Sequence, residues 1–415
     1  MISAEKALRI ILDAVPAARG ESVRLGRAAG RTAAEDITSG DDIPPFDNSS
    51  MDGFALRCAD VASAGDGHPV RLTVAGESSA GNPYGKRLRT GTAVRVMTGG
   101  VIPHGADTVV PVEHAEPAGE CAVLLRSPSP RGAFIRRKGE DIRRGRRVIA
   151  RGELLTPPHV GVLAAIGRES VRVAVRPRTA ILATGDELVP PGRTPGPGRI
   201  RNSSSYALMG MVKESGGTPV FLGIARDRKK AILKKVAEGL ASDILLLTGG
   251  VSVGAHDYVG EVLHRAGVEI RFWKVNIRPG SPLLFGVARR TLVFGLPGNP
   301  VSTAVTFLQF VRPALRRMLG RTEIFPPRFT AVAEEPLDPA GTRRSYLRGI
   351  VRREGGTLRV KTTGSQSSGV MTSMLLANCL IILPEGGKRM SAGSEVEIEF
   401  LRDPAFAHDG GGNDA

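Results

Sequence analysis

The middle of the chain alternates short apolar runs with amphipathic stretches. The apolar runs are rich in valine, isoleucine and leucine, as buried strands are, and they occupy residues 179–183, 218–224, 243–247, 268–275 and 291–296. Between them, the segments 202–215, 228–240 and 258–266 have the periodicity of helices. Strands that alternate with helices predict a doubly wound parallel sheet with right-handed crossovers, which we assign to an α/β domain at residues 177–325.

The pattern is different on both sides of this region. Residues 46–145 and 326–405 contain short β-type runs between Gly and Pro turns, which predicts an inserted β-rich domain and a C-terminal β-barrel or sandwich. Residues 1–45 and 146–176 are mixed and predict an elongated N-terminal or linking domain, with an amphipathic helix at 3–15. Residues 406–415 are expected to be a disordered tail. The fold class is therefore multidomain α/β plus β.

Composition narrows the classes of protein to consider. At 415 residues the chain is too long for one core, and no apolar run approaches the length of a membrane span. The first residues lack the layout of a signal peptide, so we expect a cytoplasmic protein that does not bind a membrane. The three cysteines are far apart in the sequence, which indicates neither a disulfide framework nor a zinc site.

The formal net charge of +16 allows three interpretations. Nucleic-acid binding is disfavoured, because the basic residues are scattered and aromatic residues make up only 4% of the chain, too few for a base-stacking platform. An arginine-rich surface without specific function is the interpretation that we favour. Attraction of an anionic, phosphate-bearing substrate remains a third.

A glycine-rich loop follows the strand predicted at 243–247. Gly249, Gly250 and Gly254 would let backbone N–H groups approach an anion closely, and the helix that begins near Tyr258 adds positive potential. Asp257 is the last residue of the loop. A carboxylate beside a phosphate-binding loop would repel the phosphate unless a cation lies between the two groups. The loop therefore predicts a phosphate-bearing ligand held together with a divalent metal ion.

Acidic residues follow the neighbouring strands as well. Asp186 and Glu187 come after the first strand and Asp227 after the second, so Glu187, Asp227 and Asp257 are expected at one edge of the sheet. Carboxylates repel one another unless they share a metal or a proton, and oxygen ligands with phosphate suit Mg²⁺. The alternative is that Asp186 and Asp227 are helix caps or turn residues.

Two further segments of the α/β domain indicate anion binding. After the last strand, Pro297 and Gly298 precede Asn299 and Pro300, which suit the N-cap and the first helical position. Lys274 and Arg278 lie at and beyond the end of another strand, within reach of an anion. The alternative for either cation alone is simple surface exposure, and Trp273 is interpreted as a packing residue.

Taken together, these segments resemble the molybdopterin molybdenumtransferase (MoeA) family, to which the C-terminal domain of gephyrin also belongs. The resemblance covers about residues 5–400. The matching segments occur in family order and are 48–55, 97–100, 139–142, 184–188, 248–258, 274–280, 295–300 and 364 onward.

The resemblance implies four domains per subunit and an elongated homodimer with the site between subunits. It also implies a transferase reaction, in which molybdate is inserted into adenylylated molybdopterin and the pyrophosphate link is hydrolysed with Mg²⁺ to release AMP. A molybdopterin adenylyltransferase and molybdoenzymes would be the protein partners.

Site roles also follow from the resemblance. The residues that would hold Mg²⁺ or position water are Asp186, Glu187, Asp227 and Asp257. The pterin phosphate would lie on Gly249, Gly250, Ser252 and Gly254, and the pocket wall would be formed by Pro297, Gly298, Asn299 and Pro300. Lys274 and Arg278 would stabilise negative charge. Contributions from other domains would come from Asp52, Thr98, Asp141, Arg348 and Ser365.

Three positions depart from the family pattern. The family commonly has lysine where this chain has Arg278 and Ser281, and often has histidine where this chain has Gln366. Arginine keeps the charge and can clamp an oxyanion with two donors, whereas serine removes a charge. Glutamine can still form hydrogen bonds but cannot titrate near neutral pH. These changes are compatible with tungstate preference, with altered anion binding or with no change.

Two other functions remain as alternatives. A non-catalytic molybdopterin carrier or scaffold would keep the fold without turnover, but it would not need Glu187, Asp227 and Asp257. A pterin adenylyltransferase would share the α/β domain, but such proteins usually consist of that domain alone.

Overall fold

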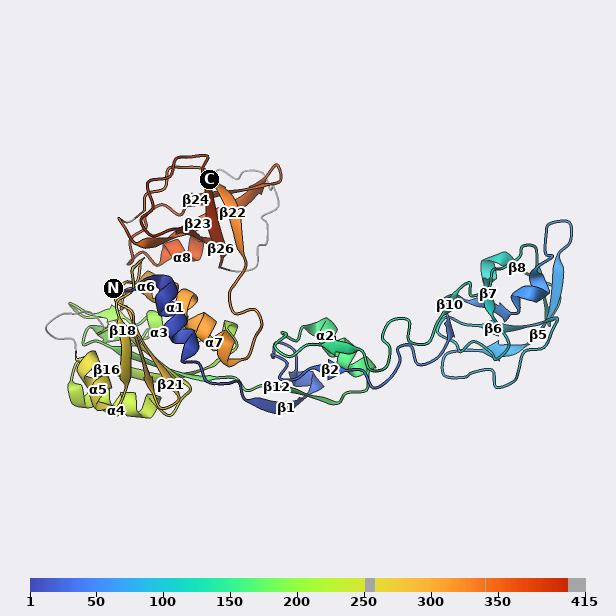
Figure 1. The fold of residues 1–415 in the computed structure, drawn as a ribbon, viewed down its shortest axis with the longest axis horizontal. Helices are drawn as coiled ribbons and strands as arrows, with labels where there is room; N and C mark the ends of the chain where they lie inside the picture. Colours follow the sequence, from blue (N-terminus) through green and yellow to red (C-terminus); the bar gives the residue numbers. More distant parts are fainter. Residues whose placement is uncertain (251–257, 340, 402–415) are drawn as a thin grey trace.

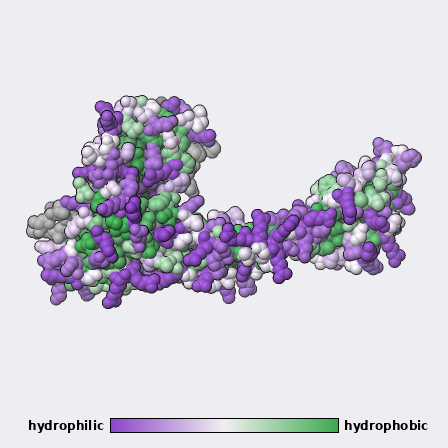
Figure 2. Space-filling model, in the orientation of Figure 1, coloured by the Kyte–Doolittle hydropathy of each residue, from purple (hydrophilic) through white to green (hydrophobic). Residues whose placement is uncertain are grey.

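The computed structural model describes residues 1–250, 258–339 and 341–401. The molecule is elongated (Figure 1), with the α/β unit and the C-terminal β-barrel at one end, a small linking unit in the middle and a β-rich unit at the far end. Figure 2 shows hydrophilic residues over most of the visible face of the linking unit. No helix within the described ranges has the length and apolarity required to traverse a lipid bilayer.

The α/β unit is built on one six-stranded sheet with the order β16-β13-β17-β21-β20-β18. Four neighbouring strands are parallel, namely β16 (Thr218–Ala225), β13 (Arg178–Thr184), β17 (Ile244–Thr248) and β21 (Thr291–Leu296). The strand β20 (Leu284–Ala288) runs antiparallel to β21 and pairs with β18 (Glu269–Trp273) at the edge. The expected doubly wound sheet is confirmed, and β20 is an addition that the sequence did not predict.

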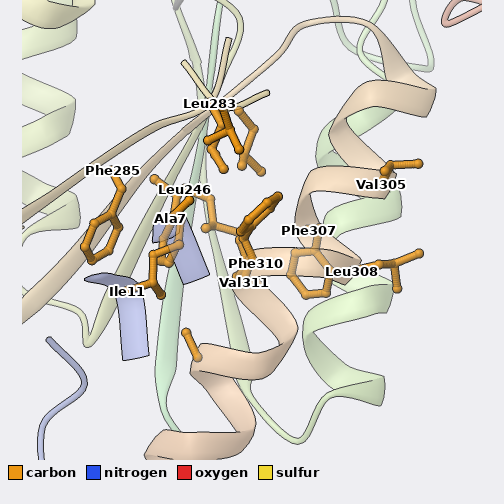
Figure 3. Close-up of a cluster of buried hydrophobic side chains, with 14 of the residues drawn as sticks. Ala7, Ile11, Leu246, Leu283, Phe285, Val305, Phe307, Leu308, Phe310 and Val311 are labelled. Carbon is orange, nitrogen blue, oxygen red and sulfur yellow. The ribbon is translucent and has the colours of Figure 1, made fainter. Parts of the chain in front are cut away.

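Alternate residues of the central strands enter two apolar cores, one on each face of the sheet. Ile181 and Leu246 face a core with the helices α1 (Ala4–Asp13), α3 (Ser204–Glu214), α6 (Pro300–Thr306) and α7 (Arg312–Met318) and the π-helix η4 (Phe307–Val311). Figure 3 shows part of this core around Leu246 and Phe310. Leu182 and Leu245 face a second core with α4 (Lys229–Gly239) and α5 (Val259–Arg265). Because both faces are covered, the strands are apolar throughout.

The N-terminal helix α1 belongs by its packing to the α/β unit. Ala7 and Ile11 are fully buried in the first core, and the Ser3 hydroxyl accepts a hydrogen bond of 3.2 Å from the Lys6 N–H. The linking unit then begins with β1 (Gly20–Arg24), which pairs with β12 (Ser170–Ala174). It also contains β2 (Ile37–Thr38), β11 (Arg147–Ile149) and α2 (Pro157–Ala165). The chain therefore crosses this unit twice, on the way to and from the far β-rich unit.

The far unit contains a six-stranded sheet with the order β7-β4-β6-β5-β9-β8. Its strands are β4 (Gly53–Leu56), β5 (Val70–Ser78), β6 (Thr92–Val96), β7 (Thr108–Pro111), β8 (Ala115–Pro117) and β9 (Ala122–Leu125). A short pair, β3 (Asn48–Ser49) with β10 (Ile135–Arg136), lies where the chain enters and leaves this unit. Residues 48–136 thus form the inserted β module.

The C-terminal unit is a closed barrel. Its strands are β22 (Arg328–Ala333), β23 (Arg344–Glu354), β24 (Thr357–Thr362), β25 (Cys379–Leu383) and β26 (Glu395–Phe400). The pairing of β23 with β25 closes the sheet, and β19 (Ile277–Arg278) from the α/β unit adds to β23. Closure decides between the barrel and the sandwich, and β19 ties the barrel to the α/β unit. The predicted tail at 406–415 lies outside the described residues.

Candidate functional site

Two glycine-containing loops meet at the carboxyl edge of the parallel strands. Gly249 has φ +88°, and a Cβ there would lie 2.5 Å from the carbonyl oxygen of Thr184. The Gly249 N–H donates to the carbonyl of Leu296, and a Cβ on Gly298 would lie 3.6 Å from the Cα of Gly249. Gly249, the first residue after β17, is therefore in contact with the loop after β21. Its positive φ and its close approach to the Thr184 carbonyl require glycine at this position.

Thr184 is a residue of this edge that the sequence analysis missed. Its side chain is 1% exposed, and its hydroxyl has no hydrogen-bond partner among the described residues. A Cβ on Gly250 would lie 2.8 Å from this hydroxyl, so the threonine lies directly beside the glycine loop. The only signal in the sequence was its place as the last residue of a buried strand before a glycine. An unpaired buried hydroxyl beside such a loop is suited to a ligand oxygen.

The predicted carboxylates follow the ends of β13 and β16. One oxygen of Asp227 accepts a 3.2 Å hydrogen bond from the Asp186 N–H, so the two loops are joined. The Asp186 carboxylate is exposed and lies 3.9 Å from the Arg226 guanidinium, while Glu187 is exposed beside Gly185. In the part of the chain that the structure describes, no three acidic, histidine or cysteine side chains form a group that could hold a metal ion. The carboxylate of Asp227 therefore joins the two loops by a hydrogen bond, and it stays a candidate to bind Mg²⁺.

The C-terminal barrel reaches the loop after β21. Asn299 is at the N-cap of α6, as predicted, but its side chain makes no capping bond and instead donates to the Ser368 hydroxyl at 2.9 Å. The Val301 N–H donates to the carbonyl of Ser368 as well. Two domains therefore fix the position of the second glycine loop.

Arg348 supports this barrel loop from within. Its side chain is 1% exposed and its guanidinium donates to the Ser373 hydroxyl at 3.2 Å and to the carbonyls of Ser365 and Ser367 at 3.4 and 3.3 Å. Burial lowers the pKa of Arg348 to about 10. The side-chain amide of Gln366 bonds to the backbone N–H and carbonyl of Arg348. Arg348 and Gln366 therefore position residues 365–368.

The predicted cations lie on the connection between the sheet and the barrel. Arg278 is exposed in β19 and lines a cavity of about 430 Å³ together with Ser345, Arg348 and Gln366. Lys274 is half-buried and adopts φ +77°, where its N–H donates to the carbonyl of Leu283. The hydroxyl of Ser281, one of the departures, donates to the carbonyl of Val275 and closes the same turn. Arg278 and the barrel loop thus share one cavity.

Asp52 and Thr98 form a separate pair in the inserted module. One oxygen of Asp52 accepts hydrogen bonds from the Thr98 N–H at 2.7 Å and from its hydroxyl at 2.8 Å. These two bonds, with a smaller contribution from the charge of Arg95, hold the pKa of Asp52 below its ordinary value. They therefore stabilise the loop at neutral pH and are lost only as the pH falls through that lowered pKa.

The site residues predicted from the sequence fall into two groups. One group lies around the sheet edge and barrel, and the other, with Asp52, Thr98 and the exposed Asp141, lies in the inserted module and at its junction with the linking unit. The module is at the opposite end of the molecule in Figure 1, so one chain does not bring the groups together. Ser252, Gly254 and Asp257 lie outside the described residues.

Family models match nearly the whole chain. Residues 2–167 match the MoeA N-terminal region (domain I and II), residues 180–317 match the "Probable molybdopterin binding domain", and residues 330–401 match the MoeA C-terminal region (domain IV). The matches follow the linking and inserted units, the α/β unit and the barrel.

Curated relatives and solved structures agree with these matches. The molybdopterin molybdenumtransferase of Haemophilus influenzae is 35% identical and covers 96% of this chain and 98% of its own length. That of Synechococcus elongatus is 38% identical over 92% of this chain and 94% of its own length. A crystal structure of the molybdopterin biosynthesis MoeA protein from Pyrococcus horikoshii has a TM-score of 0.83 and 32% identity, and the match covers 97% of this chain and 99% of that one.

Proposed function

The chain belongs to the molybdopterin molybdenumtransferase (MoeA) family and is a transferase of molybdenum cofactor biosynthesis; we propose that it inserts molybdate into adenylylated molybdopterin and releases AMP. The observation that carries this proposal is the edge of the sheet. Two glycine-containing loops, the carboxylates of Glu187 and Asp227, and the Thr184 hydroxyl, which has no hydrogen-bond partner among the described residues, lie at the ends of neighbouring strands. The backbone N–H groups of such loops can bind the oxygens of a pyrophosphate. A carboxylate nearby can orient the attacking water and accept its proton.

The reaction divides into binding, anion placement and hydrolysis. The N–H of Gly250 and the N–H groups of the loop after β21 bind the phosphates, and the Thr184 hydroxyl donates to a phosphate oxygen. Lys274 and Arg278 hold the molybdate oxyanion beside the dithiol of the pterin. The two sulfurs form bonds to molybdenum and displace one oxo ligand, which leaves as water with the two thiol protons. Water then breaks the phosphoanhydride, and Glu187 or Asp227 orients the water and accepts its proton while AMP leaves.

Magnesium fits the described residues as an ion shared with the substrate. Mg²⁺ usually takes one or two protein carboxylates together with phosphate oxygens and waters, so it does not require a group of three acidic residues. Glu187 and Asp227 would hold it, with Asp186 nearby and Asp257 beyond the described residues. When bound, the ion would neutralise charge that develops on the pyrophosphate.

The second group of predicted site residues, in the inserted module and at its junction, would contribute to the reaction through a second copy of the chain. The inserted module, with Asp52 and Thr98, and the junction near Asp141 are far from the sheet edge of their own chain. In the proposed symmetric homodimer, the inserted module of one copy would lie beside the sheet edge of the other. We expect the enzyme to act in the cytoplasm, where a molybdopterin adenylyltransferase would supply the substrate and molybdoenzymes would receive the cofactor.

The test is turnover of adenylylated molybdopterin by the purified chain with Mg²⁺, followed by release of AMP. We expect AMP to appear only when molybdate is present. A strong preference for tungstate would redefine the anion and point to Arg278 and Ser281. Tight binding of the pterin without AMP under either anion would overturn the proposal in favour of a carrier or scaffold.

A further inference from the structure

A second cavity, of about 520 Å³, opens where the linking unit, the end of α7 and the barrel meet. Gly152 and Glu153 line it from the linking unit, Arg312 and Arg316 from α7, and Phe400 from the barrel. It shares no lining residue with the cavity beside Arg278. The structure therefore contains a second concave site, at a junction of three units, that the proposed reaction does not use.

Three arginines line this cavity, and two of them have no ion-pair partner among the described residues. Arg312 forms a buried ion pair with Glu399. Arg316 and Arg321 form no ion pair with any described carboxylate, and the Nε of Arg316 is buried without a hydrogen-bond partner in the same part of the chain. The Nε of Arg321 donates a 3.3 Å hydrogen bond to the Thr32 hydroxyl.

The electrostatic environment disfavours the positive charge of Arg316. Burial, then the charges of Arg312 and Arg321, lower the pKa of Arg316 to about 10, although Glu399 and the exposed Glu323 act in the opposite direction. The other lining carboxylate, Glu153, lies 3.7 Å from His159. A bound anion would remove the repulsion between the arginines, and the guanidinium fork suits a phosphate or a carboxylate.

Three phenylalanines also line the cavity. Phe325 and Phe329 are 46% and 41% exposed, and the rings of Phe329 and Phe400 are 5.2 Å apart in an edge-to-face arrangement. Large apolar side chains are ordinarily buried, so two exposed rings in the same cavity as Arg316 and Arg321 are suited to a ligand with one charged end and one apolar body.

We propose that this cavity binds a small organic oxyanion, with its phosphate or carboxylate on Arg316 and Arg321 and its apolar body against Phe325, Phe329 and Phe400. Such a ligand would contact α7 and the barrel at once, in a cavity that Gly152 and Glu153 of the linking unit also line. The inference is independent of the reaction proposed above.

The test is calorimetric titration of the full chain with phenyl phosphate, benzoate and phenol. We expect saturable binding of phenyl phosphate or benzoate, the better of the two identifying the head group, and no binding of phenol. Arg316→Gln with Arg321→Gln should weaken binding by about tenfold or more. Arg317→Gln is the matched control, because Arg317 is exposed on the same helix and does not line the cavity. Asp227→Asn should leave binding unchanged if the ligand is not at the sheet edge.

Absence of saturable binding, or equal binding by the double variant, would overturn the proposal. If the double variant fails to fold, the unmodified chain supplies a second measurement. Phenyl phosphate should protect Arg316, but not Arg317, from an arginine-selective reagent as followed by mass spectrometry. Equal modification of both residues with and without phenyl phosphate would contradict the site.

Discussion

Replacing Glu187 with glutamine is expected to lower the rate of AMP release by about 10²- to 10⁴-fold, the range for loss of a positioned proton acceptor. Glu187 follows β13 at the carboxyl edge of the sheet, next to Gly185, and its carboxylate is exposed toward solvent. Glutamine preserves the shape but removes the negative charge that would orient water or share a Mg²⁺ ion. The measurement is single-turnover AMP release with saturating molybdate.

The fold is expected to survive this change, because Glu187 is exposed and forms no ion pair within the described chain. Glu214→Gln is the matched control, since Glu214 is an exposed glutamate of the same α/β unit at the end of α3. An unchanged melting temperature with a reduced rate in Glu187→Gln alone would support the assignment. A normal rate in Glu187→Gln would remove this carboxylate from the mechanism.

Replacing Gly249 with alanine is expected to destabilise the α/β unit by about 3 kcal/mol, the sum of a left-handed backbone cost and an overpacking cost. The added Cβ would lie 2.5 Å from the backbone carbonyl of Thr184, which cannot move without breaking the pairing of β13. The loop that we propose to bind the phosphate would shift with it. Chemical denaturation and pterin binding measure the two effects.

A glycine with similar backbone geometry but open surroundings separates the two costs. Gly198 has φ +69° and no heavy atom within 4 Å of an added Cβ, so Gly198→Ala should cost only about 1 kcal/mol. Equal losses of stability in the two variants would show that the contact between Gly249 and Thr184 is not tight. They would contradict the requirement for glycine at position 249.

The periodicity of the sequence was sufficient to predict the parallel strands of the α/β unit but not the antiparallel strand β20. The strands β13, β16, β17 and β21 are apolar runs bounded by turns, and each was predicted at nearly its observed position. The strand β20 was missed because its hairpin with β21 turns at Arg289 and Arg290, without the Asn-Gly or Asp-Gly signal of a two-residue turn. Arg289 instead adopts φ +54° itself.

The site was also predicted only in part from the sequence. Residues that follow strands were predicted because the topology of an α/β sheet places strand ends together. The contact from Asn299 to Ser368 and the burial of Arg348 were not predicted, because they depend on how the barrel packs against the sheet. Local sequence indicated an N-cap at Asn299, and the tertiary structure gave its side chain a different partner.

The most direct test of the central claim is the activity of a mixed dimer. One copy would carry Asp52→Ala and the other Glu187→Ala, with two affinity tags to isolate the heterodimer after co-expression. If the sheet edge of one copy works with the inserted module of the other, each variant alone is inactive. The heterodimer then keeps one intact site and about half of the AMP release of the unmodified chain. A heterodimer as inactive as its parents would contradict a site shared between two copies.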